Sequence, residues 1–236
     1  MFNPRPVIQA LPIHAGHKCL VIDDALIEPE RWVDFAAGHL AHFQPAAHNA
    51  FPGPELALPA DAAAALDDFF RQHIRARLGG RRTLAMNARL SMVALPPAAL
   101  QPRQWFCHRD HQQLQPGECI AASVLYLFND ESLGGTSFYV PRRPMPEIDL
   151  LIHHASTLDS AAFSARYGDI TPGYLLESNA WFERVLVVPP KWNRLIFYDG
   201  SLFHSSHVSA PHKLNTDPRN GRLTMNGFFT CRRSAG

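Results

Sequence analysis

The chain has 236 residues, of which 46% are apolar and 18% charged, so it can bury the core of one folded domain. Its formal net charge of +1, without a strongly basic stretch, argues against electrostatic binding to nucleic acid. It has no run of about 18 apolar residues and no signal peptide pattern at its N-terminus. We therefore expect a single cytoplasmic domain over residues 1–236 that does not engage a membrane, and the oligomeric state stays open.

The first 80 or so residues predict a short strand at 19–22 followed by two helices. Pro29 suits the first turn of a helix near 31–37, with acidic residues close to the positive end of the helix dipole. The alanine-rich segment 61–78 predicts a second helix, which Gly79 is suited to end. We expect this part of the chain to form a helical N-terminal region.

From residue 84 onward, short apolar runs broken by Pro, Gly and Asn predict the strands of an antiparallel barrel or sandwich. The expected strands cover residues 84–95, 104–110, 120–128, 136–140, 184–188, 194–198 and 222–231, within a core of about 84–232. Segment 141–181 interrupts this rhythm and contains a predicted helix around 149–167. Such an insertion either forms a lid or binding loop, or packs on the surface.

Four cysteines, at positions 19, 107, 119 and 231, form no CxxC pair and have no zinc-ribbon spacing. We expect them to be reduced thiols. Cys107 adjoins His108, but neighbouring residues on a strand point to opposite faces, so a packing role for Cys107 is favoured over a ligand role.

Segment 104–110 ends in His108-Arg109-Asp110. Residues two positions apart on a strand share a face, so His108 and Asp110 could hold adjacent positions on one metal ion. A third ligand from a distant strand would complete a 2-His-1-carboxylate triad, which suits non-haem Fe(II). His204 and His207 are the candidates for that ligand. The alternative is that His108 and Asp110 form a polar face at a sheet edge, as isolated His-x-Asp pairs usually do.

The last predicted strand places Arg222 and Thr224 on one face, with Leu223 and Met225 on the other. An arginine that faces a core needs an anionic partner, because an unpaired buried charge is costly. A guanidinium fork matches a carboxylate, and a hydroxyl two residues on can add a hydrogen bond. Alternatively, the polar face points to solvent and the apolar face points inward.

The order of these motifs resembles the Fe(II)/2-oxoglutarate-dependent dioxygenases, especially their prolyl-4-hydroxylase-like branch. The motifs that carry the resemblance lie at 105–110, 123–130 with 134–138, 193–204 and 221–229, and segment 21–30 is similar to the family's first strand and helix. The resemblance implies a mainly β (α+β) fold, a double-stranded β-helix (jelly-roll, cupin-like) barrel with N-terminal helices packed on one side.

The resemblance also implies site residues and cofactors. Fe(II) would be held by His108, Asp110 and His204, and 2-oxoglutarate by Arg222 and Thr224. With O2 as the second cosubstrate, succinate and CO2 would be released. Halogenating relatives have a small residue at the carboxylate position, so an aspartate there favours a hydroxylase.

The sequence departs from the family pattern at one place. Many relatives have a cosubstrate-binding tyrosine where Leu127 stands, whereas here Tyr126 comes one position earlier and is expected on the opposite face. Ser123 and Asn87 are the candidates to replace that hydroxyl. His111, which follows the triplet, is expected at the mouth of the site or on the surface.

Two other functions stay open. One is a cupin-like metalloenzyme that does not use 2-oxoglutarate, although Arg222 and Thr224 argue against it. The other is a non-catalytic binding module on the same fold, although three intact ligand types argue against that. A small-molecule substrate and a peptide substrate are equally supported, and His207 would lie beside the metal ligands or on the substrate side.

Overall fold

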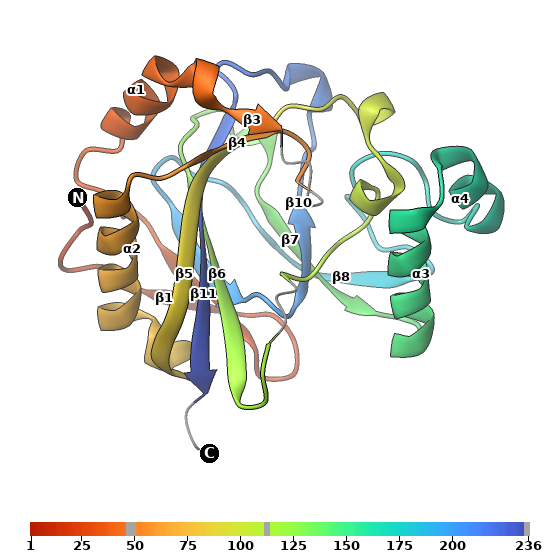
Figure 1. Cartoon of the computed structure of the whole chain (residues 1–236), viewed down its shortest axis with the longest axis horizontal. Helices are drawn as coiled ribbons and strands as arrows, with labels where there is room; N and C mark the ends of the chain where they lie inside the picture. Colours follow the sequence, from red (N-terminus) through yellow and green to blue (C-terminus); the bar gives the residue numbers. More distant parts are fainter. Residues whose placement is uncertain (46–50, 111–113, 234–236) are drawn as a thin grey trace.

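Two antiparallel β-sheets form the centre of the computed structural model, which describes residues 1–45, 51–110 and 114–233 (Figure 1). The larger sheet contains, in spatial order, β1 (Gln9–Pro12), β2 (Lys18–Ile22), β9 (Leu195–Asp199), β6 (Glu118–Tyr126), β11 (Arg222–Arg233), β5 (Gly80–Val93), β4 (Pro54–Ala57) and β3 (Gln44–Pro45). The smaller sheet contains β10 (Phe203–Ser206), β7 (Thr136–Pro141) and β8 (Phe182–Val188).

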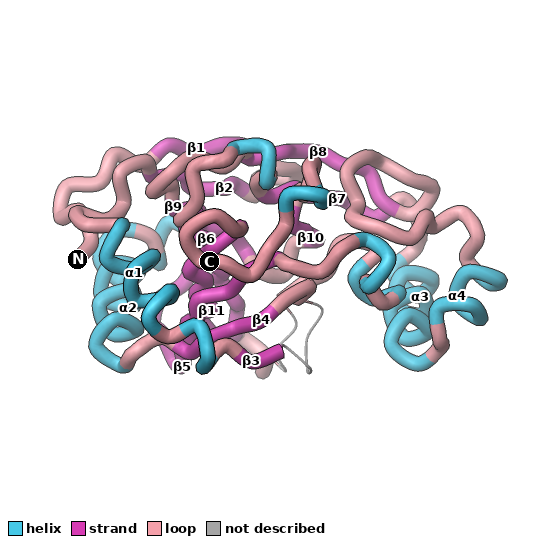
Figure 2. Tube along the Cα trace, turned by 90° about the horizontal axis from the view of Figure 1, so that it is seen from above, coloured by secondary structure: helices cyan, strands magenta, loops and turns pink. Residues whose placement is uncertain are grey.

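Helices lie at both ends of the molecule (Figure 2). The α-helices are α1 (Glu30–Gly38), α2 (Ala60–His73), α3 (Met145–Thr157) and α4 (Ser160–Arg166). Single 3-10 turns are found at Leu40–His42, Arg75–Leu78, Pro97–Ala99, Pro102–Gln104, Glu131–Leu133 and Pro211–Lys213. None of the helices in the described parts of the chain is long and apolar enough to span a membrane.

The expected mainly β fold with N-terminal helices is confirmed in outline. The predicted barrel is not closed, however: within the described ranges, no ladder of strand pairs joins the edges of the two sheets. Instead, the irregular segment before β6 contacts the smaller sheet. It makes a single β-bridge, between His108 and His204 of β10.

The strand predicted at 104–110 is wrong. Pro102 starts a 3-10 turn over Pro102–Gln104, and the Gln104 side chain caps it by accepting a 2.7 Å hydrogen bond from the Gln101 amide. Only His108 in this segment pairs like a strand residue. The short strands β1, β3, β4 and β10 are not among the predicted elements, because their few residues show little alternation of polar and apolar character.

The central strand β11 pairs with β5 on one side and β6 on the other. Leu223 and Met225 face the main core, where α1 and α2 cover the sheet. Arg222 and Thr224 point to the opposite face and line an interior cavity. The polar face of this strand therefore points into the molecule, which decides between the two alternatives left by the sequence.

Segment 141–181 contains two helices instead of one. The chain is extended at Leu158, and the Asp159 carboxylate then caps α4 by accepting a 2.8 Å hydrogen bond from the Ala162 amide. Phe163 and Tyr167 join Trp105 and other residues in a hydrophobic cluster that covers the end of the smaller sheet. These aromatic side chains thus serve packing.

Candidate metal centre and cavity

Backbone hydrogen bonds bring together two segments that lie far apart in the sequence. The His108 amide donates to the His204 carbonyl oxygen at 2.9 Å, and the His204 amide donates to the His108 carbonyl oxygen at 2.8 Å. The Asp110 amide donates to the Gly200 carbonyl oxygen at 2.8 Å. His204 lies on β10, opposite Phe138 of β7, so the irregular segment around His108 is docked on a regular sheet.

His108, Asp110 and His204 form a cluster in which each residue offers one ligand atom, all within 4.8 Å of one another. Nε2 of His204 is 3.5 Å from Oδ2 of Asp110, and Nε2 of His108 is 3.9 Å from Oδ1. Oδ2 of Asp110 is buried and accepts no hydrogen bond. A cation between the three side chains would satisfy this oxygen, so the donor set fits a divalent metal.

The His204 ring is oriented by the backbone. Its Nδ1 atom lies 2.8 Å from the Leu202 carbonyl oxygen, which can only accept, so Nδ1 carries the hydrogen and donates it. Nε2 therefore presents its lone pair towards Asp110. This is the tautomer that a metal-ligating histidine needs, held by the kind of outer contact common in metal sites.

The protonation states of the cluster also suit a metal. Burial lowers the pKa of His204 to about 4. Desolvation, and next the proximity of His204, lower the pKa of His108 to about 4, although its side chain is 42% exposed to the cavity. Burial raises the pKa of Asp110 to about 6. Near pH 7 both imidazoles are therefore neutral and the carboxylate is ionised, as metal ligands must be.

The cluster opens into a cavity of about 500 Å³, which is in the size range of small-molecule sites. Alternate residues of the central strand form one wall: Arg222, Thr224, Asn226 and Phe228. Asn87 and Arg89 of β5 lie beside them, and the three residues of the metal cluster line the same cavity. The structure thus brings all five sequence-predicted site residues to one cavity.

Arg222 is a buried cation, only 2% exposed. Its Nε donates to the carbonyl oxygens of Leu133 and Gly134 at 3.1 and 3.0 Å, and its Nη2 donates to that of Gly135 at 2.8 Å. Burial lowers its pKa to about 10, so it is still charged at neutral pH. Among the described residues no carboxylate forms an ion pair with it. The remaining N–H groups of its fork are therefore suited to an anionic ligand.

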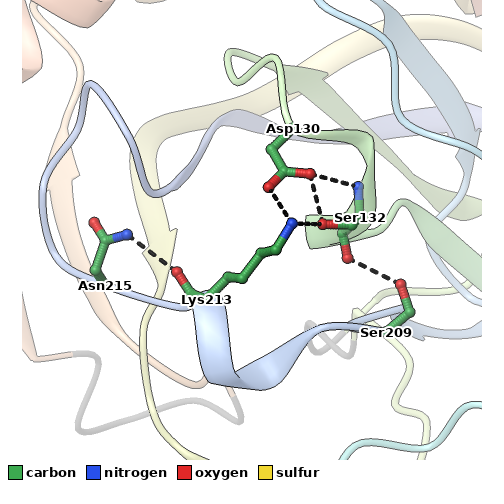
Figure 3. A network of polar contacts seen from close by, with 5 residues as sticks. All are labelled: Asp130, Ser132, Ser209, Lys213 and Asn215. Carbon is green, nitrogen blue, oxygen red and sulfur yellow. Dashed lines mark hydrogen bonds and ion pairs between the residues drawn. The ribbon is translucent and has the colours of Figure 1, made fainter.

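The loop that supplies these carbonyl groups is held by a polar network (Figure 3). Lys213 Nζ lies 2.8 Å from both Asp130 Oδ2 and Ser132 Oγ, and the Ser209 hydroxyl donates to the Ser132 carbonyl oxygen at 2.9 Å. The network fixes the turn just before the carbonyl groups that hold Arg222. Gly134 has a positive φ of 80°, and a Cβ there would overlap the backbone of His207.

Thr224 lies on the cavity wall, but its hydroxyl is engaged within the protein. It donates to the Ser91 carbonyl oxygen at 3.3 Å and accepts from the Asn226 amide group at 3.2 Å. The single hydroxyl hydrogen would have to turn away from Ser91 to reach a ligand. Arg222 is thus the principal anion-binding group at this end of the cavity.

Tyr126 and Leu127 lie on opposite faces, as expected, but Tyr126 is on the cavity side and Leu127 is in the main core. Tyr126 is directly opposite Thr224 in the ladder between β6 and β11, and directly paired residues share a face. Its hydroxyl lies 2.8 Å from Oγ1 of Thr136, which lines the cavity. Tyr126 therefore orients the hydroxyl group of Thr136. The side to which Tyr126 points is set by the pairing register of β6 with β11.

Neither proposed substitute for a cosubstrate tyrosine lies beside Arg222. Ser123 is among the residues that line the cavity. It pairs with Gly227, however, and its hydroxyl is buried without a hydrogen-bond partner on the side of the main core. Asn87 lines the cavity but pairs with Phe228, which is six residues along β11 from Arg222. Leu127 is buried in the main core.

The remaining candidates lie outside the cluster. Nδ1 of His207 is 2.9 Å from the Ser137 hydroxyl, and His207 is not within reach of the three ligand atoms. Cys107 is buried in the hydrophobic cluster beside Trp105. His111 lies outside the described residues.

Tyr198 and Arg89 are among the cavity residues that the sequence-based candidates did not include. Tyr198 is buried with its ring edge-on to His204, at 4.7 Å between centroids, and Arg89 faces the cavity from β5. Tyr198 follows three apolar residues in β9 and resembles an ordinary core residue. Arg89 alternates with Asn87 and Ser91 along β5, which indicates a shared polar face. Only the pairing of β5 with β11 shows that this face points to the cavity.

The model of DUF6445, a family of unknown function, matches residues 4–229, and the chain belongs to this family. Among curated proteins, none matches the sequence. Three solved structures illustrate what the chain is similar to. A prolyl-4-hydroxylase from Pseudomonas putida is 14% identical with a TM-score of 0.46, over 94% of this chain and 95% of that one.

HygX from Streptomyces hygroscopicus, solved with nickel and 2-oxoglutarate bound, is 12% identical with a TM-score of 0.49, over 89% of this chain and 82% of that one. An N-substituted L-amino acid dioxygenase from Burkholderia ambifaria AMMD, in complex with alpha-KG, is 13% identical with a TM-score of 0.40, over 98% of this chain and 95% of that one. With likenesses this distant, the function proposed below rests on the side chains of the cavity.

Replacing His204 by Ala should weaken the binding of Zn(II) or Co(II) by more than the roughly 10- to 100-fold typical of residues that only support a ligand. His207→Ala is the matched control, because it removes a nearby imidazole outside the cluster, and it should leave metal affinity almost unchanged. Competition titration against a chelator measures both. Equal losses in the two variants would contradict the assignment of His204.

Metal affinity should also fall with pH. Metal binding requires the ionised Asp110 carboxylate, whose pKa of about 6 is raised by burial. Affinity should therefore be nearly constant above pH 7 and decrease below pH 6, more steeply near pH 4, where both imidazoles also protonate. An affinity for Co(II) that stays constant from pH 7.5 to 5 would rule out this ligand set.

Proposed function

We propose that this chain is an Fe(II)- and 2-oxoglutarate-dependent oxygenase that hydroxylates its substrate and releases succinate and CO2. One observation carries the proposal: a His-Asp-His cluster and a buried arginine without an ion-pair partner among the described residues line the same cavity. A cation site and an anion site together match a cosubstrate that binds a metal at one end and carries a free carboxylate at the other.

His108, Asp110 and His204 would hold Fe(II), and the bound metal supplies the oxygen chemistry. The protein's part is to fix the ligands. The Leu202 carbonyl group sets the tautomer of His204, and the paired backbones of the two histidines set their separation. Three protein ligands on one side leave the opposite positions free for cosubstrates.

Arg222 would bind the distal carboxylate of 2-oxoglutarate through the N–H groups that its carbonyl partners leave free. The charges also agree. A divalent cation, one carboxylate ligand and one guanidinium together carry two positive charges, and the two carboxylates of 2-oxoglutarate would neutralise them. Thr224 would add a hydrogen bond if its hydroxyl turned away from Ser91, and Thr136 lines the same cavity.

Aromatic side chains would keep water away from the metal. Phe138 and Tyr198 pack around the His204 ring, with centroids at 6.3 and 4.7 Å. Both are buried. Exclusion of water strengthens the interactions of charged groups in the cavity and protects reactive species from side reactions.

On this proposal the two sheets represent the double-stranded β-helix of this enzyme class, with one oxygenase domain over residues 1–236. All four cysteines are buried and unpaired, in keeping with a reducing compartment such as the cytoplasm.

Aerobic incubation with Fe(II) should yield succinate only when 2-oxoglutarate is supplied, because the proposed reaction converts 2-oxoglutarate to succinate and CO2. His108→Ala should reduce succinate to background. Arg222→Lys keeps the charge but loses the fork, so it should chiefly raise the KM for 2-oxoglutarate. Succinate measured by mass spectrometry gives both results.

Arg82→Lys is the matched control for the second variant, because Arg82 is exposed on β5, and it should behave like the wild type. Normal turnover in His108→Ala would contradict the proposal. A wild-type protein that binds metal but forms no succinate from 2-oxoglutarate would indicate a cupin-like metalloenzyme. A wild-type protein that neither binds metal nor forms succinate would indicate a binding module.

A further inference from the structure

A second arginine, Arg89, faces the same cavity at a distance from Arg222. It lies on β5, directly opposite Asn226 of β11. Asn226 is four residues along the strand from Arg222, which corresponds to about 13 Å between backbone positions. The cavity therefore has one guanidinium near each end of its polar wall. A five-carbon diacid with one end on the metal cluster cannot engage both.

Contacts within the protein hold the Arg89 side chain. Its Nε atom is 3.0 Å from Glu55 Oε1 in an ion pair, although the N–H group is not aligned for a hydrogen bond. Glu55 Oε1 also accepts from the Ser91 hydroxyl at 3.3 Å. The guanidinium carbon lies 4.5 Å from the centroid of the Phe228 ring. A carboxylate and an aromatic face thus fix the orientation of the guanidinium group.

This arrangement leaves the outer edge of the guanidinium free. Glu55 lies on the Nε side, and the end of the group, formed by one N–H of each terminal nitrogen, is a separate edge. Among the described residues, neither terminal nitrogen donates a hydrogen bond to a protein acceptor. The side chain is 29% exposed, so a ligand in the cavity can reach it.

We propose that Arg89 binds the carboxylate of the primary substrate, so that the substrate is a small organic acid. This inference rests on the proposed function, in which Arg222 is occupied by 2-oxoglutarate. Two parallel N–H groups of an arginine fit a carboxylate in a bidentate manner. Val124 and Phe228 line the same part of the cavity, and they give the acid an apolar body to pack against.

The position of Arg89 relative to the metal cluster supports a role in orienting the substrate. Arg89 lines the same cavity as the three residues of the ligand cluster. An acid held at Arg89 would therefore place its carbon chain next to the ligand cluster. Arg89 would fix which carbon is presented to the metal, as a substrate-positioning clamp does.

The test uses the full chain loaded with Zn(II) and saturated with 2-oxoglutarate, which occupies the Arg222 end. The probes are straight-chain monocarboxylates from propanoate to octanoate together with 3-phenylpropanoate, each compared with its uncharged amide by calorimetry. At least one acid should bind about tenfold or more tightly than its amide, in the range of a charge-assisted hydrogen-bonded pair.

Arg89→Gln should remove this preference for the acid and leave the affinity for 2-oxoglutarate within about twofold. Arg82→Gln, on the same strand but exposed, is the matched control and should keep both affinities. If Arg89 only joins β4 to β5, Arg89→Gln would lower the unfolding temperature while the acid preference persisted, which would overturn the inference.

The inference also fails if no acid in the series binds more tightly than its amide. Its failure is distinguishable from that of the proposed function. If 2-oxoglutarate binds but no acid is preferred over its amide, only the proposed Arg89 site is contradicted. If the protein does not bind 2-oxoglutarate but still prefers an acid through Arg89, the proposed cosubstrate is contradicted and the carboxylate site is retained.

Discussion

The backbone pairing of His108 with His204 is the constraint on which the site depends. Two reciprocal hydrogen bonds, of 2.9 and 2.8 Å, dock an irregular segment on β10, and the bond from Asp110 to Gly200 extends the contact. A shift of this pairing by one residue would turn a ligand away from the others, since side chains alternate between faces. Three donors from two distant parts of the chain therefore meet in one defined arrangement.

The charges of the cavity follow from burial. Desolvation keeps the two imidazoles neutral, and it raises the pKa of the Asp110 carboxylate to about 6, so that this group is still ionised at neutral pH. The same desolvation would make the Arg222 guanidinium costly without the carbonyl groups of the 133–135 loop. The folded protein thus presents one place that favours a cation and another that favours an anion, and both line the same cavity.

Much of the candidate site is predictable because it is encoded locally. His108 and Asp110 are two residues apart, Arg222 and Thr224 alternate with apolar neighbours, and the order of the motifs indicates His204. The helices and most of the strands of the larger sheet follow from apolar periodicity and from Gly and Pro signals. By contrast, the predicted strand at 104–110 fails because Pro102 and the Gln104 cap favour a turn.

The features that the sequence does not predict depend on pairing between distant strands. Tyr126 points toward the Thr224 side because β6 and β11 meet in one register, and Ser123 points away for the same reason. Arg89 becomes a cavity residue only through its pairing with Asn226. Local periodicity gives the alternation of faces along a strand, whereas the side that faces the cavity is decided by the neighbouring strands.

Anaerobic titration of the protein with Fe(II) and then 2-oxoglutarate tests the central claim most directly. Chelation of the metal by the 2-oxo acid gives a weak visible charge-transfer band. We expect this band to appear with the wild-type chain, to be lost in Asp110→Ala, and to require more 2-oxoglutarate in Arg222→Lys. No band at saturating Fe(II) and 2-oxoglutarate, in a protein shown to bind the metal, would contradict the account.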